Sequence, residues 1–224
     1  MNRPPDKDRC LLYLFRHGDA RSDGVRRYWG QTDLPLNAAG RRQALTWRER
    51  LAGRSFSACY CSDLLRCQQT AQIIVGPDRN DIRTRPALRE IHLGEWEGRS
   101  MASIRQRHPE AFRQRGLDPG GFRPPGGESF DDLRDRVQPE LLDILRQHQG
   151  RVLVVAHAGV NRILLARLWD LPMEEIFGIP QELGCLNLIE RRGDRMRIRL
   201  HNFRPGGPFL EHKEHQKCDQ PPSF

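Results

Sequence analysis

The chain has 224 residues, of which 37% are hydrophobic and 29% are charged, and its formal net charge is +8. The length suits one large domain or two small ones, and the composition is typical of a globular protein in water. No apolar run is long enough to span a membrane, and the charged N-terminus (MNRPPDKDRC) does not resemble a secretory signal, so we expect a cytoplasmic protein.

The positive charge is almost entirely arginine, because lysine occurs only at positions 7, 213 and 217. Arginine forms bidentate hydrogen bonds to phosphate, so this excess favours an anionic small-molecule partner. The basic residues are scattered and no aromatic residues interleave with them, which argues against nucleic acid. The six cysteines form no C-x-x-C pair, so we expect reduced, buried thiols and no metal.

The first half of the chain alternates strands and helices. CLLYLF is typical of a buried strand that stops at Arg16 and His17. We expect Ser62 to cap the helix that follows SACYC. The elements expected in this half are a strand at 10–15, a helix at 38–51, a strand at 57–61, a helix from 62 and a short strand at 80–86.

The second half begins with an irregular segment, 87–127, in which we expect one short helix at 100–107. Pro139 should kink or interrupt the helix that follows, because proline lacks an N–H donor. RVLVVA is a continuous apolar run of the kind found in parallel sheets. The remaining expected elements are a helix at 128–148, a strand at 151–156, a helix after it, and strands at 185–190 and 195–200 that pair across Gly193.

This alternation predicts a single α/β domain over residues 1–203 with a mostly parallel sheet, followed by a loose tail at 204–224. The segment 87–127 is too long for an ordinary connection. Segments of that length are usually functional lids or disordered.

Two predicted strands end directly at histidines, His17 and His157. Ligands of open parallel sheets bind at the carboxyl ends of the strands, where helix N-termini also favour anions. Arg66 lies early in the helix after another of these strands. We therefore expect Arg16, His17, Arg66 and His157 to meet around a phosphoryl group.

The chemistry expected there is phosphoryl transfer through a histidine. Neutral imidazole is a nucleophile, so His17 can attack phosphorus while the other three side chains neutralise the oxygens. A carboxylic acid must then protonate the leaving group. Glu90 is the best candidate, and spacing alone leaves Glu95 and Glu97 open.

Six blocks of the sequence, from about residue 11 to about 190, resemble the histidine phosphatase superfamily, the phosphoglycerate mutase-like group. The blocks follow one another in the family's order and spacing. They are RHG at 16–18, GQTDLPLNAAG at 30–40, SDLLRCQQTA at 62–71, LREIHLGEWEG at 88–98, PPGGESFDDLRDRV at 124–137 and VVAHAGVNR at 154–162.

The resemblance implies a three-layer α/β/α sandwich with a mostly parallel sheet, a substrate cap at about 99–127, and neither metal nor cofactor. It implies that His17 is the phosphorylated nucleophile and Glu90 the proton donor. Arg16, Arg66 and His157 complete the implied phosphate pocket. The positions implied to contact substrate are Asp23, Gly30, Gln31 and Ala158.

The GEWEG block and the short cap resemble the phosphatase branch, near α-ribazole phosphatase and broad-specificity members. The expected activity is that of a metal-independent phosphomonoesterase, a phosphatase of the histidine acid type, acting on a small phosphorylated metabolite. A cofactor-dependent phosphoglycerate mutase is one alternative. A catalytically weak phosphate-binding module is another, because Asp23 stands where the family often has Asn.

Overall fold

The structure is a computed structural model in which residues 8–21, 24–204 and 206 are described. Its centre is a six-stranded sheet of strand order β3-β2-β4-β1-β5-β6. The four strands from β3 to β1 are parallel, whereas β5 is antiparallel to β1 and β6 is antiparallel to β5. The strands are β1 (Arg9–Arg16), β2 (Ala58–Cys61), β3 (Ile82–Thr84), β4 (Gly150–Ala156), β5 (Leu186–Arg192) and β6 (Arg195–Phe203).

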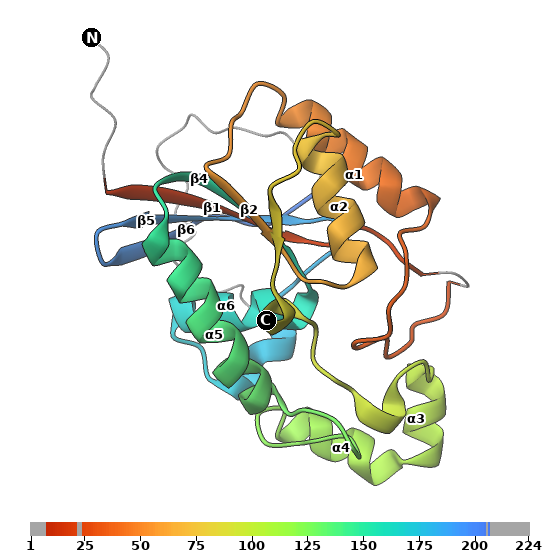
Figure 1. Cartoon of the computed structure of the whole chain (residues 1–224). Helices are drawn as coiled ribbons and strands as arrows, with labels where there is room; N and C mark the ends of the chain where they lie inside the picture. The colour runs from red at the N-terminus through yellow and green to blue at the C-terminus, as the bar shows by residue number, and fades with distance from the viewer. Residues whose placement is uncertain (1–7, 22–23, 205, 207–224) are drawn as a thin grey trace.

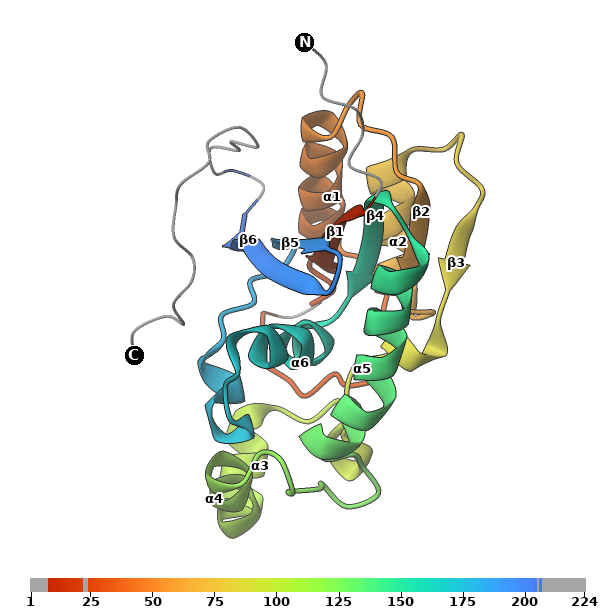
Figure 2. The ribbon, with the colours of Figure 1, turned by 90° about the vertical axis from the view of Figure 1, so that its left-hand side faces the viewer.

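Helices cover both faces of the sheet (Figures 1 and 2), so the expected three-layer sandwich with a mostly parallel sheet is confirmed. Helices α1 (Ala38–Arg50) and α2 (Leu65–Val75) lie on one face, and α5 (Phe130–Gln147) and α6 (Ala158–Trp169) lie on the other. Two further helices, α3 (Met101–Arg107) and α4 (Pro109–Leu117), lie away from the sheet at the bottom of both views. Short 3₁₀ helices occur at Pro86–Leu88, Gly94–Trp96 and Met173–Gly178.

Strand β1 is buried on both faces. Leu12 and Leu14 pack into the core beneath α5 and α6, while Tyr13 and Phe15 pack into the core beneath α1 and α2. Such burial explains the continuous apolar run, because a strand covered on two sides has no polar face to show. It also holds the end of β1, where His17 begins, in a rigid position.

Two expectations about local structure were wrong. Helix α2 begins at Leu65, and its N-cap is Leu64 rather than Ser62. The Leu65 N–H donates to the Asp33 carboxylate (2.7 Å), so a side chain from a distant loop takes the capping role. The segment expected to hold one short helix contains a second, α4, which begins at Pro109.

Pro139 lies inside α5, a helix of 18 residues in all, and does not interrupt it. Pro139 and Asp135, one turn before it, are both exposed, so the carbonyl that loses its partner faces water. The opposite side of the helix is buried, through Leu133, Val137 and Leu141 among others. That packing stabilises the helix against the missing hydrogen bond.

None of the helices in the described part of the chain combines the length and the hydropathy that crossing a bilayer requires. Of the tail predicted from residue 204, only residues 204 and 206 belong to the described residues, so that prediction lies outside them.

Candidate active site

His17 and His157 lie side by side at the carboxyl edge of the sheet. The parallel pairing of β1 with β4 sets Arg16 opposite Ala156, and each histidine is the next residue along its strand. Their rings meet edge to face with centroids 5.1 Å apart, and they are 8% and 0% exposed. The two strand endings expected from the sequence are therefore brought together.

The His17 ring is held by its own neighbour. Its Nδ1 lies 2.7 Å from the carbonyl oxygen of Gly18, and because a carbonyl only accepts, Nδ1 carries the proton. The lone pair is then on Nε2, the other ring nitrogen. A Cβ at Gly18 would lie 2.7 Å from the backbone oxygen of Gly40, so only glycine lets this turn pass so close to α1.

Arg66, in the first turn of α2, is 3% exposed and fixed by two backbone carbonyls. Its Nη1 donates to the Thr32 oxygen (2.7 Å) and its Nη2 to the Gly30 oxygen (2.7 Å). Since carbonyls carry no full charge, they orient the guanidinium without neutralising it. Gly30, expected at the substrate, is here a support of Arg66.

Arg16, like Arg66, is oriented by a backbone carbonyl. Its Nη1 donates to the backbone oxygen of Gln181, and its Nε is buried without a hydrogen-bond partner among the described residues. A buried cationic N–H with no acceptor is costly, and an anion in the pocket would supply the acceptor.

The electrostatics of the pocket keep both imidazoles neutral. Burial, followed by the charges of Arg66 and Arg16, holds the pKa of His17 well below its usual range. Burial, Arg66 and His17 do the same to the pKa of His157. Neutral His17 is the nucleophilic form, and the two guanidinium groups leave the pocket positive.

The Glu90 carboxylate lies against the first turn of α6, at Gly159, two residues after His157. The Gly159 N–H donates to its Oε2 (3.1 Å), and the Ile91 N–H donates to its Oε1 (2.9 Å). A Cβ at Gly159 would lie 2.3 Å from Oε1, so a glycine there makes room for the carboxylate. Ala158, the first residue of α6, is the small residue between His157 and this contact.

The other two glutamates have different surroundings. Glu95 is exposed. Glu97 accepts from the Gln31 N–H (2.8 Å) and the Thr32 hydroxyl (2.8 Å), so it organises the loop that holds Arg66. The Gln31 amide donates to the Glu90 backbone oxygen (3.1 Å). Of the three acids, Glu90 is the one whose carboxylate bonds to the first turn of the helix that follows His157.

Sequence reasoning missed two residues, Arg136 and Glu128, that hold the backbone around Glu90, and we call this pair the clamp. Arg136 donates to the backbone oxygens of Ala87 (3.0 Å), Arg89 (2.8 Å) and Glu90 (3.1 Å) and forms an ion pair with Glu128 (2.6 Å). Glu128 in turn accepts from the backbone N–H of His92 (2.9 Å). Both clamp residues belong to the PPGGESFDDLRDRV block, so their place in that block was the sequence signal that could have identified them.

Cys67 was also missed. Its Sγ lies 3.4 Å from Nε2 of His157 and 3.4 Å from the Ala156 carbonyl oxygen. Burial raises its pKa well above the ordinary value, so the thiol stays protonated beside the imidazole. Its position next to Arg66 in sequence is the only clue to this contact.

Asp23, expected at the substrate, lies outside the described residues. Within those residues, no three His, Cys, Asp or Glu side chains are grouped as a metal ion would need.

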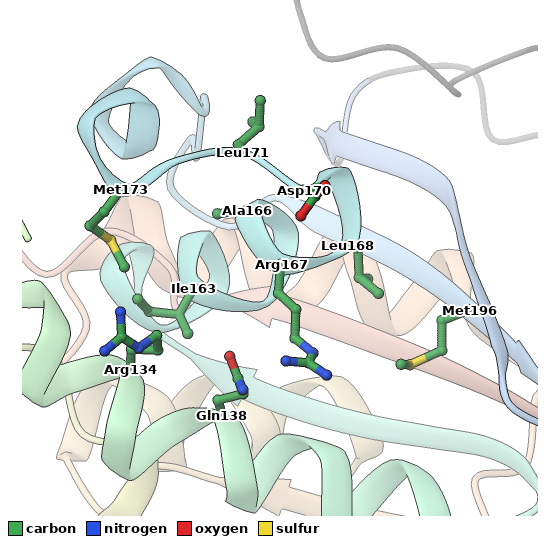
Figure 3. Close-up of a pocket in the computed structure, with 10 residues that line it drawn as sticks. All are labelled: Arg134, Gln138, Ile163, Ala166, Arg167, Leu168, Asp170, Leu171, Met173 and Met196. Carbon is green, nitrogen blue, oxygen red and sulfur yellow. The ribbon is translucent and has the colours of Figure 1, made fainter.

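A cavity of about 560 Å³ lies between α5 and α6. Figure 3 shows Arg134 and Gln138 of α5 facing Arg167 of α6 across it. Its lining contains no histidine and none of the residues of the phosphate pocket.

Comparison with known proteins finds relatives of this chain both in sequence and in structure. Residues 12–204 match the model of the histidine phosphatase superfamily (branch 1). The adenosylcobalamin/α-ribazole phosphatase of Escherichia coli (strain K12) is 31% identical over 197 residues, which cover 88% of this chain and 97% of that protein. A probable phosphoglycerate mutase GpmB of Proteus mirabilis (strain HI4320) is 38% identical over 164 residues, which cover 72% of this chain and 75% of that protein. The crystal structure of the α-ribazole phosphatase from Shigella flexneri superposes with a TM-score of 0.79 at 29% identity, covering 89% of this chain and 100% of that one.

Proposed function

This chain belongs to the histidine phosphatase superfamily, and we propose that it hydrolyses a small phosphomonoester without a metal, through a phosphohistidine at His17. The observation that carries the proposal is the orientation of His17. Its Nδ1 is bonded to the Gly18 carbonyl, so Nε2 keeps its lone pair, and the charges of Arg66 and Arg16 help to hold the pKa of the ring low. A nucleophile and the charges that stabilise its product are then in one place.

In the first step, His17 Nε2 attacks phosphorus and the bond from phosphorus to the leaving oxygen breaks. Glu90 gives its proton to that oxygen, which departs as an alcohol. Arg16, Arg66 and His157 donate to the phosphoryl oxygens as charge moves onto them. These steps leave a phosphorylated His17 and an ionised Glu90.

In the second step, water attacks the phosphohistidine. Glu90 takes the proton from that water, the phosphorus–nitrogen bond breaks, and inorganic phosphate leaves. Both protein groups return to their starting forms, so proton and charge balance over the cycle. The segment 99–127 serves as the cap that closes over the substrate.

A mutase is the second candidate, because the relative named as a probable phosphoglycerate mutase is 38% identical. The first step would be shared, and the difference is the acceptor of the phosphoryl group. A phosphatase delivers it to water, whereas a mutase returns it to a bound phosphoglycerate.

The test is phosphate release from a panel of phosphomonoesters in EDTA, with 3-phosphoglycerate in the panel. The proposal expects phosphate release by wild type and acid-labile ³²P on wild-type protein but not on His17→Ala. Formation of 2-phosphoglycerate without phosphate release would favour the mutase. Binding of phosphate by folded protein with no turnover of any compound would favour a binding module.

A further inference from the structure

We propose that Gln181 is a positioning residue that holds the Arg16 guanidinium with one edge facing the phosphoryl group. Its side chain belongs to a buried group of three amides, Asn161, Gln181 and Asn187, which we call the amide cluster. The inference rests on the proposed function, because it concerns how the same pocket orients a cation towards the phosphoryl group. Gln181 acts through Arg16 and makes no contact with substrate.

The amide cluster joins three segments in the interior of the protein. Asn161 lies in α6, Asn187 lies in β5, and Gln181 lies in the connection between the 3₁₀ helix Met173–Gly178 and β5. Asn161 and Asn187 are 0% exposed, and Gln181 is 5% exposed. Gln181 Oε1 accepts from Nδ2 of Asn161 (2.9 Å) and from Nδ2 of Asn187 (3.0 Å), while Gln181 Nε2 donates to Asn187 Oδ1 (3.0 Å). Buried amides are costly unless they are hydrogen-bonded, so these contacts fix the Gln181 side chain.

The fixed side chain also fixes the backbone around it. Gln181 Nε2 donates to the carbonyl oxygen of Pro180 (2.8 Å), so the amide is tied to the peptide unit that immediately precedes it. Asn187 is anchored in turn, because its Nδ2 donates to the Leu14 oxygen (3.3 Å) and its Oδ1 accepts from the Asn202 N–H (2.9 Å). Leu14 belongs to β1 and Asn202 to β6, so the sheet itself sets the position of Gln181.

The backbone of this connection supports the end of β1. The Gln181 backbone oxygen accepts from Arg16 Nη1. A few residues on, the Cys185 oxygen accepts from the Arg16 N–H (3.0 Å), and the Gly184 N–H donates to the His17 oxygen (3.0 Å). Of these three contacts, the one from Gln181 is made to a side chain of the pocket, so it is the contact that orients a charge.

The nitrogen that Gln181 engages decides which edge of Arg16 is left for a ligand. In a guanidinium, Nε and Nη2 form an edge with two parallel N–H groups, which suits bidentate contact with a phosphate. Gln181 takes Nη1 and leaves that edge, and Nε is buried without a hydrogen-bond partner among the described residues. Loss of the Gln181 contact would let the guanidinium rotate, and the phosphoryl group would then lose its aligned donors.

Asn161 connects the amide cluster to the second histidine. It lies four residues after His157, and its backbone N–H donates to the His157 oxygen (3.0 Å). Its side chain is tied to the cluster through Nδ2 alone, because its Oδ1 has no hydrogen-bond partner in the described part of the chain. Removing this tie should therefore loosen Gln181 less than removing the Gln181 amide does.

The experiment is a double-mutant cycle between Gln181 and Arg16, read out by the binding of orthovanadate. Orthovanadate adopts the five-coordinate geometry of phosphoryl transfer, and its binding does not require turnover. Calorimetry gives the affinity of wild type, Gln181→Met, Arg16→Gln and the double variant, and thermal unfolding checks that each is folded. Gln181→Met keeps the length of the side chain and removes the amide, and Asn187 retains its contacts with Leu14 and Asn202.

We expect Gln181→Met to weaken vanadate binding about 10-fold in the wild-type background and less than about twofold in the Arg16→Gln background. Arg16→Gln alone should weaken it about 100-fold. Asn161→Ala should weaken it about threefold with the same dependence on Arg16, and it decides the question if Gln181→Met does not fold. Gln138→Met, the same substitution at a half-buried position of α5, is the control and should bind as wild type.

Equal losses in both backgrounds would overturn the proposal, because they would show that the amide cluster supports the fold or His17 rather than Arg16. Unchanged affinity of folded Gln181→Met would also overturn it, as would a failure of wild type to bind orthovanadate. The proposed function is judged separately. If wild type binds orthovanadate but releases no phosphate from any ester, the hydrolysis proposal fails, and the cycle still decides the role of Gln181.

Discussion

The proposed phosphate pocket and the proposed cap, residues 99–127, are built in opposite ways. In the pocket, His17, Arg66 and His157 are buried, and backbone carbonyls hold the side chains of His17 and Arg66. In the cap, α4 has no buried residue and α3 has one, Ile104. Backbone supports give a geometry that side-chain changes cannot easily shift, whereas the cap presents side chains that can vary without disturbing the sheet.

The two arginine environments make the same contrast. Arg66 is oriented by two carbonyl oxygens at 2.7 Å and keeps its charge for a ligand. Arg113, in α4, forms an ion pair with Glu110 at the surface, so its charge is already neutralised. Substitutions in the pocket should therefore affect every substrate, and substitutions in the cap should change only which substrates are preferred.

Removing the nucleophile should give the largest effect. His17→Ala should lower phosphate release at least about 1,000-fold for every compound, because no other group can form the phosphohistidine. The measurement is single-turnover phosphate release with ³²P trapping. His108→Ala, at an exposed position between α3 and α4, is the control and should keep both signals. Covalent ³²P on folded His17→Ala would refute the assigned role.

Glu90→Gln should lower kcat about 100-fold or more for alkyl phosphates, because the leaving alkoxide needs a proton. The loss should be much smaller for 4-nitrophenyl phosphate, whose leaving group departs as a stable anion. Steady-state kinetics with both leaving groups measure the difference. The control is Glu95→Gln, at an exposed neighbouring position. An equal loss for both leaving groups would contradict proton donation by Glu90.

Arg136→Gln tests whether the clamp positions Glu90. It removes three hydrogen bonds to the backbone around Glu90, so kcat should fall about 10-fold, and mainly for alkyl phosphates. Arg134→Gln, on the same helix, loses only surface ion pairs with Asp131 and Asp135 and should behave as wild type. A uniform loss for all leaving groups would indicate a general structural role instead.

The pH dependence of stability should show the smallest effect. The folded-state pKa of His17 and of His157 lies below the unfolded value of about 6.5. As pH falls below that value, the unfolded chain binds protons first, and the free energy of unfolding decreases by up to about 1.4 kcal/mol per pH unit for each histidine. Urea unfolding between pH 7.5 and 5 measures the slope, and His17→Asn should reduce it. An unchanged slope in that variant would show that His17 is not buried in its neutral form.

The sequence alone predicted much of the fold. Apolar runs such as CLLYLF and RVLVVA report burial on both faces, and that burial is a property of consecutive residues. The parallel sheet follows from the alternation of strands and helices. The meeting of His17 and His157 follows because both strands end at the same edge.

Tertiary structure decided what contacts between distant segments determine. Spacing could not separate Glu90 from Glu97, but Gly159, 69 residues further on, holds the Glu90 carboxylate at the start of α6, and Gln31 holds the Glu97 carboxylate in a loop. The Asp33 cap of α2 and the Arg136 clamp are likewise contacts across the chain. Pro139 is tolerated because the packed face of α5 outweighs one lost hydrogen bond. Local sequence encodes which residues are buried and where strands end, whereas the partner of each polar group depends on which segments the completed fold brings together.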